Sequence, residues 1–278
     1  MKKPMPNWAK SLVFHTERML KMNLDEIIRT YGAIPDLTSF KRPLFVGPHP
    51  DDIEFGCGGL ISRFKELGTP VTYCIVTDGA AGSNDPAITP EMMKQMRKKE
   101  SLNAAAFMNV SNVEMLELED GGDYEVSDVI RKLAPIVLRC NPDIIFAPDA
   151  RLKTECHPDH LKTGEAARRV TQLVSHPESL RRHKVDIKGI ETFPSNITLA
   201  FYFSDDSNTL VQISESNLGD KIQALMLHES QMQDSSTELL LNYFKLKALK
   251  LGNGQGLAED YQVLVPLTQH VYAEGIHY

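Results

Sequence analysis

The chain of 278 residues is 42% hydrophobic and 24% charged, as in ordinary globular proteins, and it contains no apolar run long enough to span a membrane. Its net charge of −7 disfavours nucleic acid and anionic membranes as partners, because like charges repel. The first 22 residues lack the apolar core of a signal peptide, so we expect a cytoplasmic protein. Four scattered cysteines indicate reduced thiols rather than disulfides or a cysteine zinc site: Cys57, Cys74, Cys140 and Cys156.

The spacing of apolar residues predicts helices and strands in a regular order. Residues 1–40 have helical spacing and are predicted to form an N-terminal helical extension on a single main domain, 41–278. Short strands and longer helices then alternate, with strands at 43–47, 71–77, 113–118 and 143–147 and helices at 60–67, 90–108, 127–140 and 159–174. A weaker pattern follows, with strands at 193–203, 210–213 and 262–267 and helices at 217–230 and 236–251. This alternation predicts an α/β, Rossmann-like three-layer fold, with a mostly parallel sheet and helices on both faces.

Two clusters of histidine and aspartate follow two of the predicted strands. The first, at 48–52, contains His49, Asp51 and Asp52, and the second, at 157–160, contains His157 and His160. In an open α/β sheet, ligands bind at the carboxyl ends of the strands, so the two clusters can meet over one crevice. Imidazole nitrogens and carboxylate oxygens are the ligands of a catalytic zinc with one open position. The clusters therefore predict a hydrolytic metal site.

The spacing within each cluster suggests which side chains bind the metal and which act as acid or base. His49 and Asp52 are three residues apart, as are His157 and His160, so each pair can face one point. A three-ligand site needs His49, Asp52 and one of the two later histidines. The other histidine and Asp51 then remain for acid and base chemistry on a metal-activated water.

The two clusters also carry a resemblance to a known family. The segment from His49 to Gly59, together with His157–His160, resembles the zinc-dependent N-acetylglucosamine deacetylases of the PIG-L or LmbE-like family. The likeness runs from Leu44 to about Gln231, and the N-terminal extension makes the chain most similar in form to the archaeal diacetylchitobiose deacetylases. Further segments with counterparts in that family are 77–79, 97–100, 146–149 and 227–231.

The resemblance implies a role for each matching residue of the two clusters. His49, Asp52 and His160 correspond to the metal ligands, and Asp51 corresponds to the general base. His157 corresponds to a histidine that, when protonated, stabilises the developing oxyanion. In the implied mechanism, Asp51 takes a proton from the attacking water and returns it to the departing amine.

Four further residues match positions of the family. Asp159 corresponds to a carboxylate that tunes His157, Arg97 and Asp120 correspond to residues that hold sugar hydroxyls, and His228 corresponds to a histidine at the rim of the substrate pocket. Simpler structural explanations compete with the last three roles: a solvated helix charge for Arg97, a plain turn for Asp120 and the end of a surface helix for His228.

The function implied by the resemblance is hydrolysis of an acetamide on an N-acetylglucosamine-containing sugar, which releases acetate and a free amine. The implied cofactor is Zn²⁺, with Fe²⁺ as the alternative metal in cells. The sugar can be N-acetylglucosamine, diacetylchitobiose or a conjugate, and deacetylation of N-acetylglucosaminyl malate or of a thiol conjugate is the alternative within the family. The resemblance also implies a homo-oligomer, either a trimer or a hexamer.

The same residues are also compatible with other classes of protein. His49, Asp51 and a distant histidine also form the ligand triad of non-haem iron oxygenases, but those sites usually lie on all-β barrels. A metal-retaining protein that binds sugar without turnover is the third class, and the intact Asp51 argues against it. A dinucleotide site is disfavoured because Gly56–Gly59 lacks the required glycine spacing, and the glycine-rich stretch at 252–256 follows a helix and opens no other.

Overall fold

The computed structural model describes residue 26 and residues 32–232 and 236–270. The helical extension predicted over residues 1–40 lies mostly outside these residues. Between residues 32 and 40 the chain forms one short 3₁₀ helix, η1 (Leu37–Ser39), whose first turn is capped by the side chain of Asp36.

Seven strands form one mixed sheet in the order β3-β2-β1-β4-β5-β7-β6. The first five strands in this order are parallel, whereas β7 runs antiparallel to both β5 and β6. This arrangement confirms the predicted mostly parallel α/β sheet. The strand predicted at 262–267 begins earlier, directly after the glycine-rich turn. The strands are β1 (Pro43–Gly47), β2 (Thr72–Thr77), β3 (Asn112–Leu118), β4 (Ile144–Pro148), β5 (Thr198–Tyr202), β6 (Thr209–Ile213) and β7 (Leu257–Leu264).

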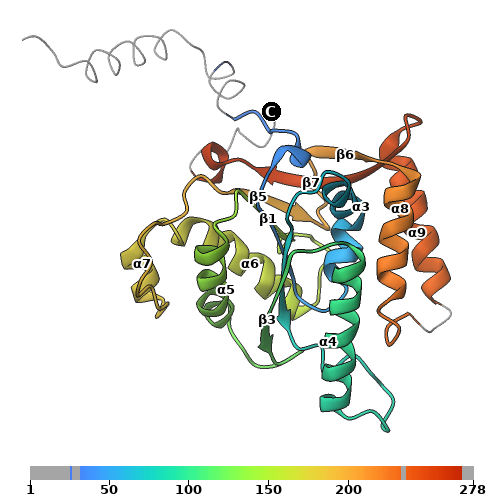
Figure 1. Cartoon of the computed structure of the whole chain (residues 1–278), viewed down its shortest axis with the longest axis horizontal. Helices are drawn as coiled ribbons and strands as arrows, with labels where there is room; N and C mark the ends of the chain where they lie inside the picture. The colour runs from blue at the N-terminus through green and yellow to red at the C-terminus, as the bar shows by residue number, and fades with distance from the viewer. Residues whose placement is uncertain (1–25, 27–31, 233–235, 271–278) are drawn as a thin grey trace, which may run out of the picture.

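Helices cover both faces of the sheet, as the sequence predicts. The helices are α3 (Asp52–Glu66), α4 (Pro90–Phe107), α5 (Val126–Cys140), α6 (Pro158–Leu173), α7 (Pro177–Arg182), α8 (Glu215–Met226), α9 (Ser236–Gly252) and the 3₁₀ helix η2 (Pro266–Gln269). Figure 1 shows α5, α6 and α7 on one side of the strands and α3, α4, α8 and α9 on the other. In the described part of the chain, no helix has the length and apolar character needed to cross a membrane.

Helix α3 begins at Asp52, well before the predicted start at residue 60, and three glycines explain the difference. Gly56, Gly58 and Gly59 lower helix propensity, so the local pattern does not indicate a helix there. Packing requires these glycines: a Cβ on Gly56 would lie 2.3 Å from the Tyr202 ring. Tertiary packing therefore determines that this helix begins before its glycines.

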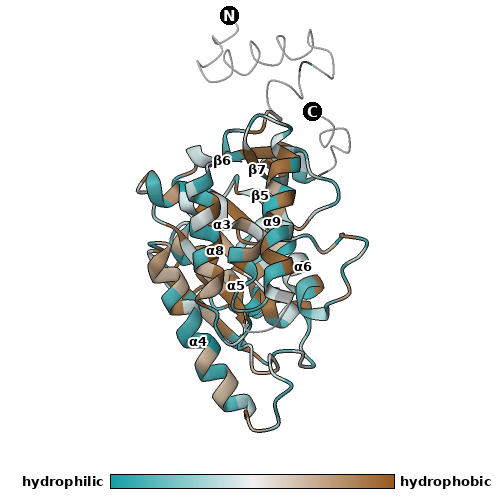
Figure 2. Cartoon of the chain, turned by 90° about the vertical axis from the view of Figure 1, so that its right-hand side faces the viewer, coloured by the Kyte–Doolittle hydropathy of each residue, from teal (hydrophilic) through white to brown (hydrophobic). Residues whose placement is uncertain are grey.

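The core divides into two clusters because successive residues of each strand point to opposite faces. Phe45 of β1 stacks on Phe146 of β4, with ring centroids 4.4 Å apart, on the face covered by α3. Leu44 and Val46 pack on the other face, with residues of α5 and α6. Both strands are buried along their whole length, and Figure 2 shows hydrophobic strands in the interior, surrounded by helices and loops of mixed hydropathy.

The four cysteines all lie in the described part of the chain, and none forms a disulfide. Cys57 and Cys74 are buried, Cys140 is half-buried and Cys156 is exposed. The prediction of free thiols is therefore confirmed.

The order of the central strands brings the two predicted clusters together. β1 pairs with β2 on one side and with β4 on the other, so the chain changes direction across the sheet between β1 and β4. Such a switch point opens a crevice at the carboxyl ends of the two strands. Helix α6 can approach this edge closely because residue 164 is glycine: a Cβ there would lie 2.3 Å from the carbonyl oxygen of Pro148.

A buried ion pair anchors helix α3, which carries Asp52 at its first position. The carboxylate of Glu259 in β7 accepts hydrogen bonds from the backbone N–H groups of Gly59 (3.0 Å) and Leu60 (2.8 Å). The same carboxylate contacts Nζ of Lys221 in α8 at 2.7 Å, and both side chains are buried. Glu259 thus ties together one strand and two helices.

Replacing Glu259 with glutamine should destabilise the fold strongly. The variant Glu259→Gln leaves the Lys221 ammonium buried without a counter-charge, a change that typically costs about 3–5 kcal/mol. Urea unfolding followed by circular dichroism measures this loss. Glu178→Gln, which removes an exposed carboxylate of α7, is the control and should leave stability nearly unchanged. A loss below about 1 kcal/mol for Glu259→Gln would show that the pair does not anchor α3.

Candidate functional site

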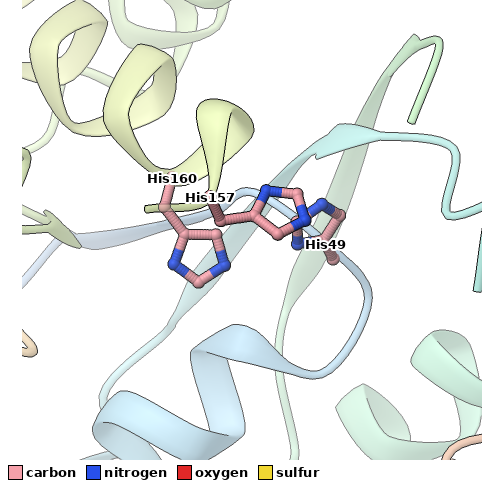
Figure 3. A group of neighbouring side chains, drawn as sticks. All are labelled: His49, His157 and His160. Carbon is pink, nitrogen blue, oxygen red and sulfur yellow. The ribbon is translucent and has the colours of Figure 1, made fainter. Parts of the chain in front are cut away.

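The two clusters meet at the carboxyl ends of β1 and β4. Oδ2 of Asp52 lies 3.0 Å from Nδ1 of His49 and 3.3 Å from Nε2 of His160. His157 joins the group, and one ring nitrogen from each of the three histidines falls within 4.8 Å of the others. Figure 3 shows the three rings gathered between the loop after β1 and the first turn of α6. The structure thus brings together all the residues assigned to metal binding.

The spacing of these atoms fits a divalent metal ion. Tetrahedral zinc with bonds of about 2.0–2.2 Å holds neighbouring ligand atoms roughly 3.3–3.5 Å apart. The two contacts of Asp52 Oδ2, at 3.0 and 3.3 Å, are close to this spacing. Two imidazoles and one carboxylate also form a donor set that zinc and iron(II) both accept. His49, Asp52 and His160 are therefore the candidate metal ligands, and a ring nitrogen of His157 lies within 4.8 Å of those of the two histidines.

Local backbone structure orients each of these side chains. His49 lies in the short turn between β1 and α3, where its own backbone N–H donates to Asp52 Oδ2 (2.9 Å). His157 is the N-cap residue of α6, and Pro158 occupies the first helical position, where proline is favoured. His160 follows in the first turn. Both clusters therefore point into the crevice from the start of a helix.

Charges in the crevice strongly shift the pKa values of the ligands. Burial alone would lower the pKa of His49, but hydrogen bonds with Asp120, Asp159 and Asp52 raise it to about 12. Burial would raise the pKa of Asp52, yet hydrogen bonds from His160 and His49 hold it well below its ordinary value. A metal ion must displace protons from these imidazoles, so its affinity should fall as the pH is lowered.

Asp51 has a different environment from its neighbour Asp52. Its backbone φ of 122° is unusual for a residue other than glycine and stores strain. The guanidinium of Arg97 binds both the carbonyl oxygen of Pro50 and Oδ2 of Asp51, the latter at 2.9 Å. Burial raises the pKa of Asp51 to about 6, against the opposing effect of Arg97. A carboxylate held in this way suits a general base near neutral pH.

Asp159 has a partner other than the one predicted. Its fully buried carboxylate accepts hydrogen bonds from the Tyr124 hydroxyl (2.8 Å) and the Gly121 backbone N–H (2.9 Å), and it faces Nε2 of His49 at 3.2 Å. Its charge raises the pKa of His157, the residue it was expected to tune, while its direct contact is with His49. The reason is that Asp159 is in the first turn of α6, where its side chain turns toward β1 and the loop after β3.

The surroundings of His157 lower its pKa and so favour the neutral ring over the protonated one expected from the sequence. Burial and the nearby charges of His49 and His160 lower its pKa. Its Nδ1 accepts the backbone N–H of Asp159 at 3.3 Å, which places the proton of the neutral ring on Nε2. The neutral ring can therefore still donate one hydrogen bond into the crevice.

Arg97 and Asp120 both lie at the site, and Asp120 also lies in the turn expected there, in which the backbone N–H of Gly122 donates to the carbonyl oxygen of Glu119. Arg97 is only 4% exposed, so it is not a solvated helix charge. Oδ1 of Asp120 lies 3.2 Å from Nε2 of His49, and Oδ2 accepts the backbone N–H of Ala81 at 3.1 Å. Their predicted roles in holding sugar hydroxyls stay predictions.

His228 does not lie at the rim of an open pocket, and this expectation was wrong. Its side chain is fully buried after the end of α8, with Nε2 3.6 Å from Oε2 of Glu54 in α3. The chain turns inward at His228, whose backbone N–H donates to the carbonyl oxygen of Leu225. Packing against α3 therefore explains the burial of this residue, and its charge interacts with those of Asp51 and Arg97 at the site.

Sequence reasoning missed two residues that contact His160. Oε2 of Glu155 lies 2.9 Å from Nδ1 of His160, and the ring of Phe203 lies parallel to the imidazole with centroids 6.5 Å apart. Phe203 also has a left-handed backbone, with φ of 55°. Glu155 precedes the second cluster by only two residues, which was the one available signal, whereas nothing local indicates Phe203.

Comparison with known proteins identifies the family. The family model described as PIG-L, GlcNAc-PI de-N-acetylase, matches residues 44–171, which contain both clusters. A probable N-acetyl-alpha-D-glucosaminyl L-malate deacetylase 2 of Bacillus cereus is 30% identical over 175 residues, which cover 58% of this chain and 78% of the relative. The chain belongs to the PIG-L family. The resemblance seen in the sequence is thereby confirmed.

Two further PIG-L relatives match most of the chain. The diacetylchitobiose deacetylase of Thermococcus kodakarensis is 28% identical over 239 residues, 86% of this chain and 83% of the relative. The solved structure of the N,N'-diacetylchitobiose deacetylase from Pyrococcus horikoshii, in complex with an inhibitor, covers 97% of each chain with a TM-score of 0.78 and 25% identity. The fold class and the resemblance to diacetylchitobiose deacetylases are confirmed.

The geometry predicts which single replacements remove the metal. His49→Ala and His160→Ala each delete a candidate ligand atom, and Asp52→Asn replaces the anionic carboxylate with a neutral amide, so these variants should retain little zinc after loading and dialysis, whereas His157→Ala should retain it. Metal content per chain, measured by plasma emission spectrometry, gives the result. Because the ring of His157 lies within 4.8 Å of the other two, loss of the metal from His157→Ala would make this histidine a ligand.

Proposed function

We propose that this protein is a metal-dependent N-deacetylase that removes the acetyl group from an N-acetylglucosamine-containing sugar and releases acetate and a free amine. The observation that carries the proposal is that His49 and His160 both face Oδ2 of Asp52. Beside them lies Asp51, which has a buried carboxylate and a strained backbone. The deacetylases among its PIG-L relatives support the same reaction.

In this proposal His49, Asp52 and His160 hold the metal, with zinc as the first choice and iron(II) as the alternative. A bound divalent ion would polarise the amide carbonyl and lower the pKa of a water molecule. The outer nitrogen of each imidazole ligand faces a carboxylate: Asp159 beside His49 and Glu155 beside His160.

Asp51 acts as the general base. With a pKa of about 6 it is mostly ionised at neutral pH, yet it is basic enough to accept a proton from water. Arg97 binds Oδ2, so we assign proton transfer to Oδ1. Asp51 then delivers the proton to the amine nitrogen as the C–N bond breaks, and the carboxylate is restored.

His157 stabilises the carbonyl oxygen as negative charge develops on it. The N–H at Nε2 is the donor, because Nδ1 is already occupied by the backbone N–H of Asp159. Loss of one such donor typically costs about 3–4 kcal/mol in the transition state, or a factor of about 10²–10³ in kcat. A neutral ring is sufficient for this role.

The preferred substrate is a short N-acetylglucosamine sugar of the diacetylchitobiose type. The two relatives with that name match 86% and 97% of the chain, whereas two malate deacetylases match 58% and 73% of it, so the malate conjugate is the second candidate. Arg97 and Asp120 are the side chains proposed to reach sugar hydroxyls.

We also propose a cytoplasmic homo-oligomer, either a trimer or a hexamer, in which residues 1–40 form the helical extension of one deacetylase domain.

The competing assignments use the same residues differently. An iron oxygenase could use the same two histidines and Asp52 as ligands, but such sites usually lie on all-β barrels, whereas this chain has a mostly parallel α/β sheet. Sugar binding without catalysis does not require a residue with a strained backbone and a carboxylate of raised pKa, such as Asp51. Both comparisons favour hydrolysis.

Release of free amine from three sugars by the zinc-loaded protein tests the proposal. The substrates are N-acetylglucosamine, diacetylchitobiose and N-acetylglucosaminyl malate. Asp51→Asn removes the base but keeps its shape, so kcat should fall by about 10²–10⁴ while zinc is retained. Asp123→Asn, an exposed carboxylate of the loop before α5, is the matched control and should keep full activity. Equal release by Asp51→Asn and the parent protein would remove the assigned base.

The same assay separates the competing classes. Hydrolysis should proceed at the same rate with and without dioxygen and should release one acetate for each amine. A rate that depends on oxygen would support the iron oxygenase, and sugar binding without acetate release would support the non-catalytic protein.

Arg97 should set the acidic limb of the pH profile. Because its guanidinium lowers the pKa of Asp51, the variant Arg97→Met should raise that pKa, so that the ionised base forms only at higher pH. The acidic limb of kcat/KM should therefore move toward alkaline pH, whatever the change in maximal rate. Lys98→Met removes an exposed cation from the same helix and serves as the control. An unmoved limb in Arg97→Met would mean that Asp51 is not the titrating base.

A further inference from the structure

A carboxylate outside the predicted clusters contacts the second metal-binding histidine. Nε2 of His160 faces Asp52, and the opposite ring nitrogen, Nδ1, lies 2.9 Å from Oε2 of Glu155. We propose that Glu155 is the positioning residue of the metal centre: it selects Nε2 of His160 as the metal-binding nitrogen and fixes the plane of the ring. This inference rests on the proposed metal-dependent function.

Both carboxylate oxygens of Glu155 are directed at the second cluster. Oε1 accepts the backbone N–H of His157 at 2.8 Å, and Oε2 faces His160. The side chain is 16% exposed, and the backbone N–H of Glu155 donates to the carbonyl oxygen of Leu152 in the loop after β4. One carboxylate therefore spans the first turn of α6, from the proposed oxyanion donor to the proposed metal ligand.

The chemistry of the imidazole ring explains why this contact matters. A neutral histidine carries its proton on one nitrogen and can bind a metal only through the other. A carboxylate beside Nδ1 favours the proton at that atom and leaves the Nε2 lone pair free to face Asp52 Oδ2. The contact also makes Nε2 more basic and hence a stronger ligand. In this structure Nδ1 and Oε2 are 2.9 Å apart, although the N–H at Nδ1 is not aligned with Oε2 for a hydrogen bond.

The other neighbours of the ring cannot replace this function. Phe203 lies parallel to the imidazole, with an angle of 11° between the planes, and it limits tilting of the ring. A stacked hydrocarbon ring does not distinguish one imidazole nitrogen from the other. His49 has an equivalent arrangement, since Asp159 faces its Nε2 while its Nδ1 faces Asp52. Each of the two ligand histidines thus has a carboxylate at its outer nitrogen.

The variant Glu155→Gln tests the proposal through metal affinity, without any substrate. Glutamine can still accept the backbone N–H of His157, but it presents no charge to His160. Titration of the apoprotein with Zn²⁺ in competition with a chromophoric chelator should show about 10–100-fold weaker binding. The visible absorption of bound Co²⁺ should also change, because the geometry of one ligand is altered. Glu165→Gln, in helix α6 with His160 and paired with Arg169, is the control and should bind both metals like the parent protein.

Unchanged Zn²⁺ affinity and an unchanged Co²⁺ spectrum in Glu155→Gln would overturn the proposal. If that variant fails to fold, as judged by circular dichroism, Glu155→Asp provides the same test, because the shorter side chain keeps the charge but withdraws it from His160. Parent-like affinity in Glu155→Asp would then overturn it. A weakened Zn²⁺ affinity, together with a parent protein that releases no amine from any sugar, would support the role of Glu155 and refute the proposed deacetylase.

Discussion

The site depends on the parallel pairing of β1 with β4 in the middle of the sheet. Leu44 pairs with Ile145 and Phe45 with Phe146, so the two strands end at the same edge. Because of this pairing, Nε2 of His49 lies 3.2 Å from Oδ2 of Asp159, although the two residues are 110 positions apart in the chain. Both strands are buried on both faces, and burial of apolar surface is the main free-energy contribution that holds them in this register.

Two adjacent carboxylates acquire different chemistry from their surroundings. Asp52 is the first residue of α3 and faces two imidazoles, which hold its pKa far below the ordinary value. Asp51 precedes the helix with a strained backbone, is buried beside Arg97, and has its pKa raised to about 6. Asp52 therefore stays ionised and is suited to binding a cation, whereas Asp51 is suited to accepting a proton.

A ring of further contacts holds these groups in place. Glu259, paired with Lys221, holds helix α3 through the backbone N–H of Gly59. Asp159 and Glu155 face the ring nitrogens of His49 and His160 that point away from Asp52. Most of these partners come from other elements of the chain than the groups they support. Precise placement of the metal ligands therefore depends on the whole α/β core rather than on the two short clusters alone.

The sequence by itself determined the alternation of strands and helices, the free cysteines and the two clusters, because apolar periodicity and short motifs are local. It could not reveal the early start of α3, where tight packing overrides the low helix propensity of Gly56 and its neighbours. Only the tertiary structure decided that His228 is buried, that Asp159 contacts His49 and that Glu155 contacts His160. The physical reason is that burial and the choice of partner are set by the folded backbone, which brings together side chains whose local sequence carries no trace of the contact.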